Sequence, residues 1–66
     1  MKSLQKVLDK AWAGGFKTKS NFAREHADSV AACASLGYIT THIRGFQYGN
    51  TWRITKEGLE ALRELH

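Results

Sequence analysis

The first helix is predicted by apolar side chains that recur at helical spacing near the start of the chain. They follow the i, i+3, i+4, i+7, i+8 pattern of a helix with one buried face, and they are Leu4, Val7, Leu8, Ala11 and Trp12. Two glycines, Gly14 and Gly15, follow directly, and glycine adopts the left-handed conformation that ends many helices. The pattern therefore predicts a helix over residues 3–13.

A second stripe begins after Thr18, Ser20 and Asn21, which are all good N-cap residues. It repeats at spacings of 4, 4, 3 and 4 through Phe22, His26, Val30, Cys33 and Gly37. Since no glycine or proline occurs between residues 20 and 36, the simplest interpretation is one helix over about 20–36. A break near residues 26–29, with Asp28 or Ser29 capping a second helix, is the alternative.

The third segment has the composition of a β-hairpin. Residues 38–43 and 51–55 are rich in β-branched and aromatic side chains. Between them, Gly49-Asn50 favours a two-residue type II′ turn, which requires glycine first. A β-bulge at Gly45 would bring the flanking apolar side chains onto one face.

A last helix is predicted over residues 56–65, capped by Thr55 and with Glu57 in its first turn. Its leucines are three residues apart, which favours packing on the core, although the same stripe is a candidate seam for a homodimer. These leucines are Leu59, Leu62 and Leu65. The order helix, helix, β-hairpin, helix predicts an α+β fold in a single domain spanning residues 1–66.

Charge adds a candidate partner to this picture. Ten Lys and Arg against six Asp and Glu give the 66 residues a net charge of +4. Residues 1–55 hold eight basic and three acidic side chains (+5), and residues 56–66 hold two and three (−1). A small domain with a basic body has the electrostatic character of a nucleic-acid binder, although a basic surface also serves solubility alone.

Two segments resemble winged helix-turn-helix proteins. Residues 36–39 read LGYI, similar to the turn from the recognition helix of that family into the first strand of its wing. Residues 52–58 read WRITKEG, similar to the aromatic-x-Ile/Leu-Thr-x-x-Gly segment that leads into the closing helix. The resemblance implies a small winged helix with its recognition helix at about 20–36 and its wing at about 43–52. The family places three helices before the wing, whereas the pattern here predicts two unless residues 20–36 break.

The resemblance implies that the partner is double-stranded DNA, bound by a small regulator of transcription or of another DNA transaction. Cations and backbone N–H groups just before a helix meet phosphate, whereas asparagine and arginine, here Asn21 and Arg24, can read adenine and guanine. The polar side chains of the wing are expected to follow the DNA backbone or the minor groove. The predicted DNA-binding residues are Lys17, Lys19, Ser20, Asn21, Arg24, Arg44, Gln47, Tyr48, Asn50 and Arg53.

Other interpretations of these residues remain open. Arg24 and Asp28 are also placed for an i, i+4 ion pair on a solvated helix. The aromatic side chains Phe46, Tyr48 and Trp52 favour an alternative function, in which the wing binds a larger protein and the domain has no meaningful DNA affinity.

Catalysis, a metal site and a cofactor are not expected. The histidines lack the mutual spacing of metal ligands, and Cys33 is two helical turns from His26, too far for a shared ligand on a straight helix. Cys33 is instead expected to be a small buried hydrophobe. One cysteine excludes an internal disulfide, and no apolar run approaches the ~20 residues of a membrane span. A reducing cytoplasm is the expected compartment.

Overall fold

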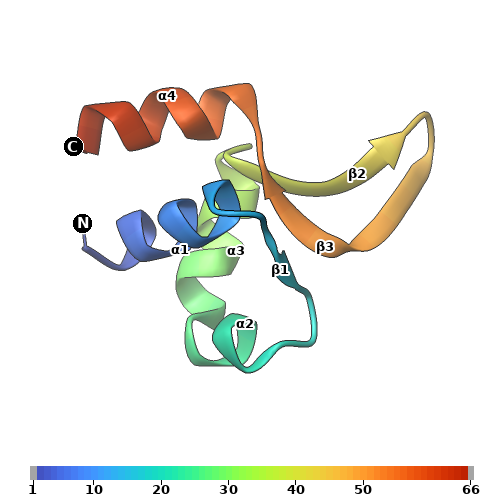
Figure 1. Cartoon of the computed structure of the whole chain (residues 1–66), viewed down its shortest axis with the longest axis horizontal. Helices are drawn as coiled ribbons and strands as arrows, with labels where there is room; N and C mark the ends of the chain where they lie inside the picture. The colour runs from blue at the N-terminus through green and yellow to red at the C-terminus, as the bar shows by residue number, and fades with distance from the viewer. Residues whose placement is uncertain (1, 66) are drawn as a thin grey trace.

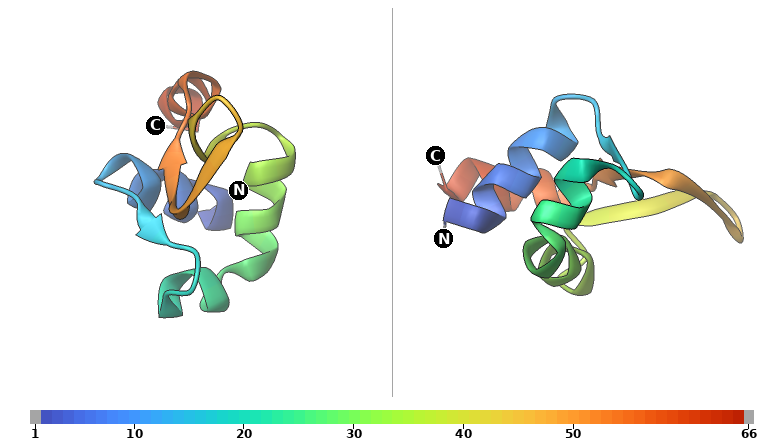
Figure 2. Two further views of the ribbon diagram at one scale, coloured as in Figure 1. Left: turned by 90° about the vertical axis from the view of Figure 1, so that its right-hand side faces the viewer. Right: turned by 90° about the horizontal axis from the view of Figure 1, so that it is seen from below.

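The computed structural model describes residues 2–65, which form a small α+β fold (Figure 1). The elements in chain order are α1 (Lys2–Trp12), β1 (Phe16–Lys17), α2 (Asn21–Glu25), α3 (Ala27–Ser35), β2 (Ile39–Arg44), β3 (Gln47–Ile54) and α4 (Lys56–Leu65). The first and last helices agree with the prediction to within one residue. The helices form a body from which the β2–β3 hairpin projects to one side (Figures 1 and 2).

A third strand that the sequence pattern did not predict joins the hairpin. β1 pairs antiparallel with β3, with Phe16 opposite Trp52, and gives a three-stranded sheet in the order β1-β3-β2. A two-residue strand is too short to show an alternating pattern, and it exists only because β3 supplies its partner. The predicted order of helix, helix, hairpin and helix is therefore incomplete.

The prediction of one helix over residues 20–36 is wrong, because the chain breaks at His26 into α2 and α3. The His26 amide donates to the Phe22 carbonyl at 3.0 Å and closes α2, while the His26 carbonyl accepts from Val30 at 2.8 Å and opens α3. The break turns α2 back toward β1, where the ring of Phe22 packs on that of Phe16 with centroids 4.9 Å apart. A straight helix would fit the same apolar spacing, but in the fold the contact between Phe22 and Phe16 of β1 accompanies the break.

The core lies where α1 packs against α3, α4 and the base of the hairpin. Each of these elements contributes small or medium apolar side chains, and no polar side chain in the described part of the chain is buried. The buried residues are Val7, Leu8, Ala11, Phe16, Ala23, Val30, Cys33, Ile39 and Leu62. A core this thin leaves little redundancy, so the loss of one contact is expected to weaken the whole fold.

The turn of the hairpin lies at Gly45-Phe46, not at Gly49-Asn50 as predicted. Arg44 pairs with Gln47 directly across it, and Gly45 adopts a φ of +55°, which glycine tolerates without steric cost. Gly49-Asn50 instead lies within β3, where the register with β2 shifts on either side of His42. The predicted bulge at Gly45 is thus replaced by irregular pairing further down the ribbon, and the apolar side chains near the tip stay exposed.

The two segments that flank the hairpin form capping structures at one junction. At the end of α3, Gly37 donates to Ala34 at 3.0 Å and Tyr38 donates to Cys33 at 2.9 Å, the pair of bonds that defines a Schellman motif. At the start of α4, the Thr55 hydroxyl accepts from the Gly58 amide at 3.0 Å. This predicted cap is confirmed, and the hydroxyl also lies 2.6 Å from the Gly37 carbonyl, so it links the two junctions.

Candidate nucleic-acid interface

The loop before α2 and the middle of β3 meet at one corner of the molecule. The Thr18 amide donates to the Asn50 carbonyl at 2.8 Å, which extends the pairing of β1 with β3. Around this bond lies a shallow hollow of about 470 Å³, and the residues that line it are Lys17, Thr18, Lys19, Ser20 and Asn50. Four of the ten predicted DNA-binding residues are therefore brought together here, although Asn50 is 30 positions or more from the other three.

Ser20 has a structural role in this corner. Its hydroxyl accepts from the Ala23 amide at 3.2 Å and donates to the Lys17 carbonyl at 2.7 Å, so it caps α2 and holds the loop. The lysine side chains on either side, Lys17 and Lys19, are exposed. The cap thus fixes the backbone that carries the two cations.

Asn21 and Arg24 lie on α2, and both are exposed. Arg24 lines a second hollow of about 330 Å³ at the turn between α2 and α3, together with residues 25–29. Among the side chains that the structure describes, Arg24 and Asp28 form no ion pair, so the bond expected on a continuous helix is absent. The helix break separates them, and the guanidinium group remains available to a ligand.

α3 carries small side chains on its exposed side and one carboxylate. Its exposed residues are Ala27, Asp28, Ala31 and Ser35. None of them has a long hydrogen-bonding side chain. Both predicted base readers consequently belong to α2, and α3 contributes a smooth surface beside them.

The remaining predicted residues lie along the hairpin. Arg44 and Gln47 face each other next to the turn, and the Tyr48 ring packs edge-on against His42 with centroids 5.3 Å apart. Arg53 lies near the base of the ribbon, opposite Thr40. All four side chains are exposed. They extend the polar surface from the Lys17 corner outward instead of joining the hollow.

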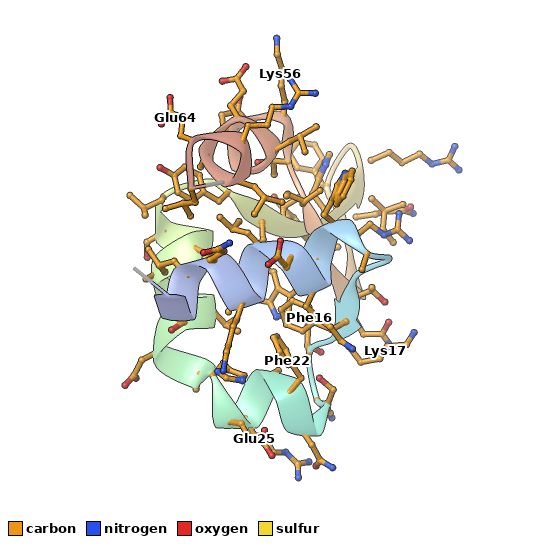
Figure 3. All side chains as sticks on the ribbon, turned by 60° about the vertical axis from the view of Figure 1, so that its left-hand side comes forward. Phe16, Lys17, Phe22, Glu25, Lys56 and Glu64 are labelled. Atoms are coloured by element: carbon orange, nitrogen blue, oxygen red, sulfur yellow. The ribbon has the colours of Figure 1, made fainter. Side chains whose placement is uncertain are left out.

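Lys10 is a cation near this region that the sequence did not single out. Its ammonium group lies 5.8 Å from the centroid of the Phe22 ring, so α1 delivers a positive charge to the edge of α2. Figure 3 shows Phe22 beside Phe16, with Lys17 nearby and Glu25 at the lower end of α2. Lysines recur every four residues in the sequence at positions 2, 6 and 10, and only the contact with Phe22 shows that Lys10 reaches α2.

Cys33 is fully buried, as expected from its place on the apolar stripe. Burial raises the pKa of its thiol above the ordinary value of 9.0, because the thiolate loses its hydration inside the core. A buried neutral thiol is a poor nucleophile. Cys33 therefore belongs to the packing of α3 against α1.

The raised pKa of Cys33 predicts a loss of stability at alkaline pH. Above about pH 9 the unfolded thiol ionises while the native thiol stays protonated, so ionisation stabilises the unfolded state and not the native state. The free energy of unfolding should fall more steeply with pH in the wild type than in Cys33→Ala. Urea unfolding at several values between about pH 7 and 10 measures both slopes, and equal slopes would contradict the assignment.

The leucines predicted as a candidate dimer seam have different environments. Leu62 is 3% exposed and belongs to the core, whereas Leu59 is half-buried and Leu65 is 38% exposed. Trp12, Leu59, Leu62 and Arg63 line a hollow of about 370 Å³ between α1 and α4. Association through α4 stays a prediction, and it would rest on the exposed edge of this hollow more than on Leu62.

Residues 2–65 contain no cluster of three or more His, Cys, Asp or Glu side chains placed to hold a metal ion. None of the helices they form is long and apolar enough to cross a membrane. Comparison of the chain with protein-family models, with curated proteins and with solved structures gave no match.

Proposed function

We propose that this chain is a small winged-helix protein that binds double-stranded DNA and regulates transcription or another DNA transaction. The order of its elements supports the proposal. The break at His26 yields three helices before the hairpin, which is the number that the winged-helix resemblance requires. The short strand β1 joins the hairpin, and α4 follows directly from the WRITKEG segment.

The observation that carries the proposal is the convergence of exposed cations on one corner. Lys17 and Lys19 line the hollow beside Asn50, and outside this hollow Lys10 of α1 lies over the Phe22 ring of α2. In the described part of the chain, neither Lys17 nor Lys19 is neutralised by an ion pair. Unpaired cations around a hollow suit a phosphate group of a nucleic-acid backbone.

The proposed role of each side chain in DNA binding follows from its position. Lys17 and Lys19 hold one DNA strand through its phosphates, and Arg44 and Arg53 follow the backbone along the hairpin. Asn21 and Arg24 reach base edges from α2. Since the exposed side of α3 carries no long polar side chain, most of the affinity comes from the phosphate contacts, and sequence preference is modest. The reducing cytoplasm remains the proposed compartment, which suits the free thiol of Cys33.

Titration of a labelled random duplex tests the proposal through its salt dependence. Four phosphate contacts predict a slope of about −3.6 for log K against log salt, or about twelvefold weaker binding for each doubling of salt. Fluorescence anisotropy should give dissociation constants of roughly 1–100 μM near physiological salt. Circular dichroism of the same sample verifies that the protein is folded. A folded sample that leaves the duplex unbound at low salt would refute the proposal.

A second candidate function is supported by the apolar side chains of the hairpin. Ile43, Phe46 and Tyr48 are 54%, 100% and 68% exposed. Exposed apolar clusters are typical of protein interaction sites. In this alternative the hairpin docks on a larger protein and the duplex titration shows no binding.

A further inference from the structure

The tip of the hairpin presents an aromatic ring that no other part of the molecule covers. Phe46 is 100% exposed and is the second residue of the two-residue turn that Gly45 begins. The hairpin leads away from the helices, so its tip lies far from both termini and from the core (Figures 1 and 2). The ring therefore stabilises nothing within the domain, and it is free to enter a partner.

Contacts across the ribbon support this turn. The His42 Nε2 atom lies 2.9 Å from the Gly45 carbonyl oxygen, and the His42 ring packs edge-on against Tyr48. Arg44 and Gln47 pair on either side of the turn. Because these contacts already order the turn, Phe46 loses little conformational entropy when it binds a partner.

The charge around the ring favours an anionic partner. The hairpin contains Arg44 and Arg53, and no Asp or Glu occurs anywhere between residues 29 and 56. Phe46 thus stands close to one cation, Arg44, and far along the chain from any carboxylate. Duplex DNA combines an anionic exterior with flat apolar surfaces between its base pairs, and a ring flanked by Arg and Gln matches both.

The shape of the tip distinguishes DNA from a protein partner. The turn has only two residues and ends in the ring of Phe46, so the ring alone, and not the ribbon behind it, has to enter a minor groove about 6 Å wide. In a protein interface, an anchoring ring is normally surrounded by further contacts that exclude water. The exposed Ile43 and Tyr48 lie in the strands behind Phe46 and do not enclose its ring, whereas a wedge between base pairs requires no such surround.

We propose, on the basis of the DNA-binding function above, that Phe46 inserts between neighbouring base pairs from the minor groove and bends the duplex. Arg44 and Gln47 lie at the edges of the groove and contact its acceptors and phosphates. Insertion unstacks one base step, which is easiest at a flexible pyrimidine–purine step such as TA. A wedge from this side kinks the duplex toward its major groove.

A duplex of about 20 base pairs with central TA steps tests the wedge. It carries 2-aminopurine in place of one adenine, whose fluorescence rises on unstacking, and a donor and acceptor dye at its ends. Wild-type protein should raise the 2-aminopurine signal and bring the ends closer. Phe46→Ala should abolish both signals and weaken binding about tenfold. Phe46→Tyr, which keeps the ring, should restore them.

Trp12→Ala provides the matched control. It removes another exposed aromatic side chain, from α1 instead of the hairpin, and should leave the bend unchanged. If wild-type protein binds a duplex that stays straight and stacked, or if Phe46→Ala bends DNA as the wild type does, the wedge is wrong and DNA binding stands. If the folded wild type binds no duplex, the proposed function fails and the wedge fails with it.

Discussion

Gly58→Ala is expected to cost about 3 kcal/mol or more in the free energy of unfolding. A Cβ atom on Gly58 would lie 2.0 Å from the Tyr38 carbonyl oxygen and 2.8 Å from Ile54 Cγ1. The carbonyl has little freedom to move, because it accepts a hydrogen bond of 2.9 Å from the Thr55 amide, where the start of β2 lies against the start of α4. The clash must therefore be relieved by shifting α4 away from the core.

The expected loss of stability is opposite in sign to the usual effect of replacing glycine by alanine in a helix, so the two cases are easily told apart. At an unconstrained helix position, alanine stabilises relative to glycine by about 1 kcal/mol, so contact with Tyr38 must reverse the usual preference. A chain of this length has a total stability of roughly 3–10 kcal/mol, so the variant should lose about a third of it or more. Thermal and urea denaturation followed by circular dichroism measure the change.

Gly37→Ala is the matched control for Gly58→Ala. A Cβ atom there would meet no atom within 4 Å, although the φ of +77° adds a strain of about 1–2 kcal/mol. The control should therefore lose less stability than Gly58→Ala. A Gly58→Ala variant as stable as the wild type would mean that α4 does not lie against the start of β2.

A Lys17→Ala/Lys19→Ala double variant is expected to bind duplex DNA about 60-fold more weakly than the wild type at 0.1 M salt. Each lost phosphate contact should lower affinity about eightfold at this salt, and together they should reduce the salt slope by about 1.8. Both side chains are exposed, so the fold should be unaffected to within about 0.5 kcal/mol. Anisotropy titrations from low to physiological salt measure both the affinity and the slope.

Lys56→Ala/Arg63→Ala removes the same charge from α4. In Figure 3, Lys56 lies at the end of the molecule opposite Glu25, and Lys17 lies between them, toward the Glu25 end. Charges more than a Debye length of about 10 Å away are largely screened at 0.1 M salt, so the control should change affinity by less than about threefold. An equal loss in both double variants would show that net charge alone drives binding, and it would overturn the assignment of the Lys17 corner.

The two terminal helices were predictable because the sequence patterns that define them are local and extend over several turns. α1 and α4 each carry an apolar stripe over three turns, with a start or stop signal beside it. The WRITKEG segment is a further local signal, since the threonine hydroxyl caps a helix whose amide donor is only three residues away. Such features depend on hydrogen bonds and periodicity within one segment, so no knowledge of the rest of the chain is needed.

The hairpin turn was misplaced because two glycines fit the local rule. Gly49-Asn50 has the composition of a turn, but in the fold Asn50 accepts a hydrogen bond from Thr18 and so belongs to β3. A Cβ atom on Gly49 would also come within 3.1 Å of Ile43 Cδ1. Pairing with β1 thus draws this dipeptide into the sheet, and the turn moves to Gly45.

For the candidate site, too, the sequence predicted the chemistry of the residues, and the fold decided which of them lie together. The sequence named the cations and polar side chains from their chemistry, but it treated the loop before α2 and the hairpin as separate groups. It also missed Lys10, whose position over Phe22 depends on how α1 crosses α2.

By itself, the sequence determined the terminal helices, the Thr55 cap, the buried character of Cys33 and the basic charge of residues 1–55. Only the tertiary structure decided the break at His26, the strand β1, the turn at Gly45 and the meeting of Lys17 with Asn50. The physical reason is the range of the forces involved. Helical periodicity and capping act within a few residues. A strand, in contrast, needs a partner strand, and an aromatic ring needs a surface to pack on, and both are supplied by other segments of the chain.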